Sequence, residues 1–406
     1  MTKPELMARF DEWVGDPAVT RADVERFVAD PDRAGEPFLG RYYVCSTSGT
    51  TGEPALFVHD PAAMAVYRSF SIRADLMWLS RSDWLSLTRR GFRWAAVVGT
   101  GGHFGGEAWI EYERRRSWWR RRTYRIFSVQ QPLDALTKQL EEFDPAIVTS
   151  YPSAAALLAE QQSAGRLHVR PAVFETSGES MAPPVRDLLR ATWGRAVRNV
   201  YATSEFNPLA FECDQGWLHV NSDWAVLEPV EADHSPTPAG TASYTVLLTN
   251  LANRVQPIIR YDLGDSVLER PDPCPCGNAL QAVRVVGRRD DLLVLQTPEG
   301  TEVTLIPLAV GSVVEGSPGV HRSQLIRTGP TSLRLRIEVR PGADPEPTWQ
   351  QVTARLRDYL DRQGLPTTRI ERATEPPEPS ARSGKFRQVI AAGPGPSTLG
   401  SARGGG

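Results

Sequence analysis

The stretch that decides the fold reads Ser46-Thr47-Ser48-Gly49-Thr50-Thr51-Gly52-Glu53-Pro54. It lies between a strand expected at 40–45 and a helix expected at 61–79. Successive small residues let backbone N–H groups approach phosphate oxygens closely, and the hydroxyl groups add further donors. A polar turn has the same composition, and no Gly-Lys-Ser/Thr closes the stretch as in a Walker sequence. The composition alone leaves both a phosphate-binding loop and an ordinary turn open.

Strands and helices alternate on both sides of this stretch. Apolar residues at helical spacing predict helices, and short apolar runs predict buried strands. Helices are expected at 20–32, 61–79, 134–143 and 152–165, and strands at 40–45, 84–87, 94–100, 147–151 and 173–176. This alternation is typical of an α/β domain built from layered sheets and helices.

From about Phe211 the chain is richer in strands. Strands are expected at 225–228, 245–250, 283–286, 292–295, 324–327 and 333–339, and an amphipathic helix at 348–363. Because single cores stop growing at about 250–300 residues, we expect two domains. The first is a large N-terminal domain at 1–287 with a β-rich subdomain at about 207–287. The second is a small mobile α+β lid at 288–392, followed by a disordered tail at 393–406.

The composition excludes several classes of partner. A formal net charge of −2 gives no general attraction for nucleic acid or anionic lipid, so neither partner is expected. No apolar run of about eighteen residues and no signal-peptide core occurs, which favours a cytoplasmic protein. The four cysteines are too few and too unevenly spaced for a disulfide framework.

Five further short segments follow the first stretch in the chain. They are Ser177-Gly178-Glu179, Tyr201-Ala202-Thr203-Ser204-Glu205, Arg260-Tyr261-Asp262-Leu263-Gly264-Asp265, Gly287-Arg288-Arg289-Asp290-Asp291 and Ser383-Gly384-Lys385-Phe386-Arg387. In order and across nearly the whole chain, the six segments resemble the motifs of the acyl-adenylate-forming superfamily, which includes acyl-CoA synthetases, luciferases and adenylation domains. The sequences IIRYDLGD at 258–265 and GKFR at 384–387 are most similar to the corresponding motifs of the phenylacetate–CoA ligase group.

The resemblance implies a role for each segment. Lys385 would stabilise charge on the reacting phosphate, and the Glu205 carboxylate would hold Mg²⁺. Asp290 would be the hinge between the domains. The residues implied to contact ATP or AMP are Ser48, Gly49, Thr50, Thr51, Gly52, Ser177, Gly178, Glu179, Tyr201, Ala202, Thr203, Ser204, Asp265 and Arg288. Taken singly, these residues also fit plainer interpretations, such as turn aspartates, surface arginines and linker turns.

Two residues are candidates for the pocket that would hold the acyl group. His103 lies in a glycine-rich loop at 100–106 after an expected strand, and Tyr151 ends another expected strand. A turn histidine is an equally good interpretation of His103. One departure concerns Ala55, which stands where the resembling proteins often have a lysine, and this puts only the detail of the phosphate loop in doubt.

The activity implied by the resemblance is ATP-dependent activation of a small, aromatic carboxylic acid as acyl-AMP, with release of pyrophosphate. The acyl group would then pass to a thiol, with coenzyme A preferred over a carrier protein. Alternatives are an amine acceptor, an inorganic acid as substrate, or a non-catalytic nucleotide-binding protein. The implied cofactors are ATP, Mg²⁺ and coenzyme A, and a homodimer is compatible with the resemblance.

Three cysteines and one histidine form a candidate metal set in the β-rich region. Cys213, His219, Cys274 and Cys276 have the composition of a closed structural zinc site. The Cys-x-Cys spacing is tighter than usual and the gap to His219 is long, so buried unpaired thiols are the alternative. Some proteins similar to phenylacetate–CoA ligases carry a structural zinc.

Residues 114–122 contain six arginines and two tryptophans. Arginines beside stacking aromatics can bind nucleic acid, but the rest of the chain is not basic. We therefore favour a solvated or partner-facing surface, with a contact to coenzyme A as the weaker alternative.

Overall fold

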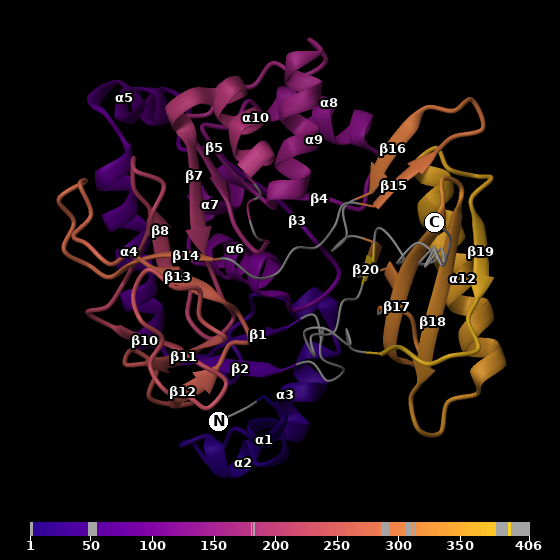
Figure 1. Ribbon diagram of the computed structural model, residues 1–406, viewed down its shortest axis with the longest axis horizontal. Helices are drawn as coiled ribbons and strands as arrows, with labels where there is room; N and C mark the ends of the chain where they lie inside the picture. The colour runs from indigo at the N-terminus through magenta and orange to yellow at the C-terminus, as the bar shows by residue number, and fades with distance from the viewer. Residues whose placement is uncertain are drawn as a thin grey trace, which may run out of the picture. The chain divides into compact units, whose positions relative to one another are not determined.

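The computed structural model describes residues 3–47, 55–179, 181, 183–285, 293–305, 310–311, 313–314, 316–378 and 389–390. The chain divides into two compact units, Met1–Arg289 and Asp290–Gly406 (Figure 1). Residues 48–52 of the predicted phosphate loop, Arg288, Asp290, Lys385 and the predicted disordered tail lie outside the described residues.

A nine-stranded sheet forms the centre of the first unit, in the order β13-β14-β9-β8-β7-β6-β5-β3-β4. The strands from β7 to β4 in this order are parallel to one another, and β8 begins the antiparallel part. Apolar residues dominate the parallel strands, as expected for strands covered on both faces. The bounds are β3 (Trp94–Val98), β4 (Tyr124–Ser128), β5 (Ile147–Ser150), β6 (Val173–Thr176), β7 (Val197–Tyr201), β8 (Ala210–Glu212), β9 (Leu218–Val220), β13 (Val267–Glu269) and β14 (Ala282–Val285).

Helices cover both faces of the parallel strands. Trp78 of α4 packs against Val173 of β6, whereas Trp193 of α10 stacks on Phe174 with the ring centroids 4.2 Å apart. Because neighbouring residues of a strand point to opposite faces, α4 and α10 lie on opposite faces of the sheet. The helices are α4 (Pro61–Trp78), α5 (Arg81–Arg89), α6 (Gly105–Arg115), α7 (Trp118–Thr123), α8 (Leu133–Phe143), α9 (Pro152–Ser163) and α10 (Pro183–Trp193).

Two smaller sheets complete the first unit. β1 (Tyr43–Ser46) pairs antiparallel with β2 (Leu56–His59), and Ser46 lies opposite Leu56, so the two strands bracket residues 47–55. The second sheet has the order β10-β11-β12. Its strands are β10 (Ala225–Val230), β11 (Thr245–Asn250) and β12 (Ile258–Asp262), and three short helices, α1 (Lys3–Ala8), α2 (Phe10–Trp13) and α3 (Arg21–Val28), precede β1.

The second unit is a small α+β domain. Its four-stranded sheet has the order β19-β18-β17-β20, and α12 packs Val352, Leu356 and Leu360 into a core with Leu333 and Leu335. The bounds are β15 (Leu293–Gln296), β16 (Glu302–Leu305), β17 (Val320–Gly329), β18 (Ser332–Val339), α12 (Pro345–Arg362), β19 (Arg369–Arg372) and β20 (Val389–Ile390). The predicted α/β class, with a larger N-terminal and a smaller α+β C-terminal domain, is confirmed.

One predicted strand was wrong. Residues 84–87 belong to α5, because Ser80 and Asp83 form a capping box that starts a helix. Leu87 is buried while Leu85 is half exposed, which is the burial pattern of a helix face. Helices α6 and α10 were not predicted. Within the described residues, no helix is both long and apolar enough to cross a membrane.

Candidate functional site

Two of the predicted motifs and the predicted pocket residue Tyr151 follow neighbouring parallel strands. β5, β6 and β7 end at Ser150, Thr176 and Tyr201, and their carboxyl ends lie at the same edge of the sheet. Tyr151, the segment 177–179 and the segment 202–205 follow directly. In open α/β sheets, ligands bind outside the carboxyl ends of the strands. The topology therefore brings these residues to one candidate site.

Tyr151 and Gly178 are in close contact at this edge. The Tyr151 hydroxyl accepts a hydrogen bond from the Gly99 N–H at 3.1 Å, and burial raises the pKa of this hydroxyl. Gly178 has a φ of +82°, and a Cβ there would lie 3.0 Å from the Tyr151 ring. Glycine is required for both reasons. The Tyr151 ring thus supports the turn at 177–179, and its assignment to an acyl pocket stays a prediction.

Tyr201 connects two motifs that are far apart in the sequence. Its hydroxyl donates to Oδ2 of Asp265 at 2.7 Å, and the exposed fractions of the two residues are 9% and 5%. The acidic residue of the same motif, Glu205, is 7% exposed. The motif at 201–205 and the end of the motif at 260–265 therefore lie side by side at the carboxyl end of β7.

His103 packs against the N-terminal part of the first unit. It is 1% exposed, its Nε2 lies 2.9 Å from the Asp30 carbonyl oxygen, and its ring meets the Phe27 ring edge to face. Burial lowers the pKa of His103. These contacts give His103 a packing role, and a place in the acyl pocket stays a prediction.

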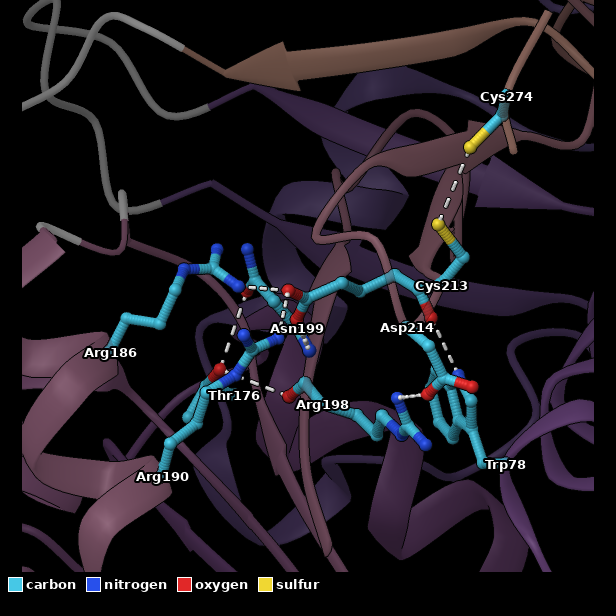
Figure 2. Close-up of polar contacts among 10 residues, drawn as sticks. Trp78, Thr176, Arg186, Arg190, Arg198, Asn199, Cys213, Asp214 and Cys274 are labelled. Atoms are coloured by element: carbon cyan, nitrogen blue, oxygen red, sulfur yellow. Dashed lines mark hydrogen bonds and ion pairs between the residues drawn. The ribbon is translucent and has the colours of Figure 1, made fainter. Parts of the chain in front are cut away.

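The four candidate metal ligands come together. One ligand atom from each of Cys213, His219, Cys274 and Cys276 lies within 4.8 Å of all the others. The Cys213 and Cys274 sulfurs are 3.8 Å apart (Figure 2), and the Cys276 sulfur is 3.2 Å from His219 Nε2. Two thiolate sulfurs, each about 2.3 Å from a tetrahedral Zn²⁺, lie about 3.8 Å apart. The observed separation matches this geometry.

The backbone orients the histidine of this set. His219 Nδ1 lies 3.0 Å from the Leu280 carbonyl oxygen, and a carbonyl can only accept. Nδ1 therefore carries the proton, and the Nε2 lone pair points to the sulfurs, as in metal sites whose histidines are held by a carbonyl group. The donor set fits a structural metal ion such as Zn²⁺.

Glu212 directly precedes Cys213, the first residue of the candidate metal set, and was not among the predicted site residues. Its side chain is 1% exposed and forms ion pairs with Arg186 and Arg190 of α10. The Asn199 N–H donates to the same carboxylate at 2.8 Å, and the Trp78 indole donates to the Glu212 carbonyl at 2.7 Å. Figure 2 shows the arginines reaching toward β7 and β8 from the helix. No local sequence signal marks Glu212, because its partners come from distant elements.

Some arginines of the run at 114–122 form ion pairs and are partly buried. Glu113, which is 4% exposed, lies against Arg120 and against Arg68 of α4. Trp118 is 70% exposed, with the Arg122 guanidinium 5.3 Å from its ring centre. The run is therefore part exposed and part held by ion pairs, and its interpretation as a solvated or partner-facing surface stays a prediction.

Comparisons with known proteins place the fold. No family model matches the chain. Protein CapK of Staphylococcus aureus is 27% identical over 212 residues, which is 51% of this chain, and the chain spans only 45% of CapK. A crystal structure of 2-hydroxyisobutyryl-CoA ligase in complex with 2-HIB-AMP and CoA is similar with a TM-score of 0.50 and 19% identity.

That similarity covers 96% of this chain and 89% of the ligase. The amide bond synthetase McbA from Marinactinospora thermotolerans gives a TM-score of 0.46 at 16% identity, over 85% of this chain and 67% of McbA. The similarity to the 2-hydroxyisobutyryl-CoA ligase, at a TM-score of 0.50, shows that the chain has the fold of the adenylate-forming ligases, with an N-terminal and a C-terminal domain.

Proposed function

We propose that the chain converts a small carboxylic acid and ATP into an acyl-AMP and pyrophosphate, and then transfers the acyl group to a thiol. The observation that carries this proposal is the hydrogen bond of 2.7 Å between Tyr201 and Asp265. It brings two nucleotide motifs together beside a third, at the edge of the sheet where α/β proteins bind ligands.

Each motif would meet one part of the nucleotide. The turn at 177–179 would lie against the adenine, and the Asp265 carboxylate would accept ribose hydroxyls. Glu205 would hold the Mg²⁺ that bridges the phosphates. The loop at 46–54, Arg288 and Lys385 would meet ribose and phosphate oxygens. An oxygen of the substrate carboxylate would attack the α-phosphorus, pyrophosphate would leave, and Lys385 would stabilise the developing charge.

Coenzyme A is the acceptor and an aromatic acid the substrate in this proposal. The choice of acceptor and the choice of substrate both rest on the similarity of the motifs at 258–265 and 384–387 to those of the phenylacetate–CoA ligase group. Rotation at Asp290 would remove Lys385 from the site and admit the thiol, so the two half-reactions would use two orientations of the C-terminal domain. A carrier-protein thiol or an amine is the alternative acceptor. We propose a cytoplasmic location, where ATP and coenzyme A are available.

The test is pyrophosphate release from ATP with a panel of aromatic and aliphatic acids, each with and without coenzyme A. Acid-dependent release and a new thioester are expected. Acid-dependent release that coenzyme A leaves unchanged would redirect the second step to another acceptor. No acid-dependent release with any acid would contradict the proposal.

We also propose that Cys213, His219, Cys274 and Cys276 hold one structural Zn²⁺. The convergence of four soft ligand atoms within 4.8 Å supports this, and a set of four protein ligands would leave no position open for catalysis. When bound, the ion would join the hairpin β8–β9 to the segment before β14. The site would therefore stabilise this part of the fold and take no step in the reaction.

Elemental analysis of protein purified without added metal is expected to find about one zinc per chain. Cys213→Ser should lose the metal and lower the melting temperature. Cys45→Ser is the control for metal content and should keep the metal, since Cys45 is also buried but lies outside the four-ligand set. Metal-free wild-type protein of unchanged stability would contradict the zinc proposal.

A further inference from the structure

The backbone carbonyls of Ser204 and Glu205 are held by side chains from three other strands. His59 of β2 lies with Nε2 3.0 Å from the Ser204 oxygen. Asn250 of β11 donates from Nδ2 to the Glu205 oxygen at 2.9 Å. The Cys45 thiol of β1 lies 3.7 Å from the Ser204 oxygen. The backbone of the acidic motif is therefore anchored on both carbonyl groups.

Tyr67 of α4 joins the two main anchors. Asn250 Nδ2 donates to the Tyr67 hydroxyl oxygen at 2.7 Å, and that hydroxyl lies 3.3 Å from His59 Nδ1. Because the Ser204 carbonyl can only accept, His59 Nε2 carries the proton and Nδ1 accepts from Tyr67. Every hydrogen bond in this network then has one allowed direction.

The network is buried and fully oriented. The exposed fractions of His59, Tyr67 and Asn250 are 2%, 1% and 5%. Burial lowers the pKa of His59 to about 4, so the ring is neutral as the acceptor at Nδ1 requires. The Asn250 Oδ1 accepts from the N–H groups of Ala252 and Asn253 at 2.9 and 3.2 Å, which fixes the amide orientation. Satisfied buried networks of this kind are rigid.

The network also connects two of the predicted motifs. Cys45 belongs to β1 and His59 to β2, the two paired strands that flank the stretch at 46–54 expected to bind phosphate. Ser204 and Glu205 follow β7 in the central sheet. The hydrogen bonds therefore fix the strands that flank the expected phosphate loop relative to the backbone that carries the Glu205 carboxylate.

We infer that His59, Tyr67 and Asn250 are positioning residues, which fix the Ser204–Glu205 backbone against the β1–β2 hairpin and so orient the Glu205 carboxylate for Mg²⁺. This inference rests on the proposed function, since that function supplies the Mg²⁺·ATP. Residues that hold a metal ligand in place typically change metal affinity or activity about 10- to 100-fold when altered.

The test is acid-dependent exchange of pyrophosphate into ATP, measured at fixed ATP over a range of free Mg²⁺, in wild type and in Tyr67→Phe. The substitution removes one hydroxyl and keeps the ring. We expect the Mg²⁺ concentration for half-maximal rate to rise about tenfold. Tyr42→Phe is the matched control, because its hydroxyl donates to the Asp16 carboxylate at 2.5 Å and is outside the network.

A second pair of variants tests the donor at His59. The amide N–H of His59→Gln can reach the position of Nε2, whereas His59→Leu has no donor. We expect the Mg²⁺ dependence of His59→Gln to be closer to wild type than that of His59→Leu. The two variants are compared at the same folded fraction, measured by circular dichroism. Equal Mg²⁺ dependence in Tyr67→Phe and Tyr42→Phe, in an active wild-type background, would overturn this inference alone. An inactive wild-type protein would overturn the proposed function and this role with it.

Discussion

Strands β7 and β8 are neighbours in the central sheet, yet the polar side chains that follow them have different kinds of partner. After β7, the motif at 201–205 is held by a hydrogen bond from Tyr201 to Asp265 and by hydrogen bonds from His59 and Asn250 to its carbonyl groups. After β8, Cys213 faces three other soft ligand atoms within 4.8 Å. The first region is built by the protein itself, and the second has the form of a site that an added ion would complete.

Because of this difference, experiments can distinguish the two regions. A region held by oriented hydrogen bonds should respond to single hydroxyl or imidazole changes through affinity and pH dependence. A region completed by an ion and by a buried ion pair should respond mainly through stability. The predictions below are ordered from the largest expected effect to the smallest.

The largest effect should come from Lys385→Ala. We expect acid-dependent pyrophosphate release to fall by about 10²- to 10³-fold, because one charge-stabilising donor at the reacting phosphate is lost. Thioester formation from supplied acyl-AMP should survive better, since Lys385 is expected to serve adenylation alone. Lys138→Ala is the matched control. Equal loss of both half-reactions would contradict the assignment.

Glu212→Gln tests the second region. The substitution leaves Arg186 and Arg190 facing a neutral group at a side chain that is 1% exposed. We expect the free energy of unfolding to fall by about 3 kcal/mol, as when one partner of a buried ion pair is removed. Glu25→Gln, at a side chain that is 51% exposed, should cost under about 1 kcal/mol. Similar losses in the two variants would show that the Glu212 ion pairs are not stabilising in this way.

The first region should show a pH dependence through His59. Its pKa of about 4 in the folded protein lies below the ordinary value of about 6.5, so between these values the unfolded chain binds a proton that the folded chain does not. This contribution to stability is complete above about pH 6.5 and is lost as the pH falls toward 4, by about 3 kcal/mol in all.

Urea unfolding at pH 7 and pH 4.5 checks this, with His59→Gln as the comparison. Tyr43 and Tyr67 stay protonated in this range, and Asp60 is present in both proteins. Wild type should lose more stability than His59→Gln on acidification. The same loss in both proteins would mean that His59 is not the titrating group.

The smallest effect is expected for Tyr201→Phe, which removes the hydroxyl that donates to Asp265. We expect kcat/KM for ATP to fall about fivefold, equivalent to about 1 kcal/mol for one hydrogen bond. Tyr124→Phe, on the far edge strand β4, is the control. An unchanged kcat/KM would remove Tyr201 from the account of nucleotide binding.

The same two regions show what the sequence could reveal. The segment 177–179 could be placed at a strand end, because it follows the short apolar run at 173–176, whereas the strand before 201–205 was not predicted. Four residues carry too little periodicity to distinguish a strand from a helix, which is why the prediction of a strand at 84–87 was wrong. The capping box at Ser80 and Asp83 starts a helix there.

The network behind Glu205 could not be predicted, because its members are distant in sequence. Asn250 and Tyr67 are 183 positions apart, and neither has a local motif. The four metal-ligand candidates could be chosen by residue type, since cysteine is rare in this chain. Their convergence depended on the pairing of β9 with β14, where Ala282 lies opposite His219, and no spacing rule gives that pairing.

The most direct test of the central claim is exchange of labelled pyrophosphate into ATP, which requires reversible formation of an acyl-AMP. Wild type should catalyse exchange only when a carboxylic acid and Mg²⁺ are both present. Glu205→Gln should need much more Mg²⁺ while keeping its folded structure. Exchange without added acid, or no exchange with any acid of the panel, would contradict the account.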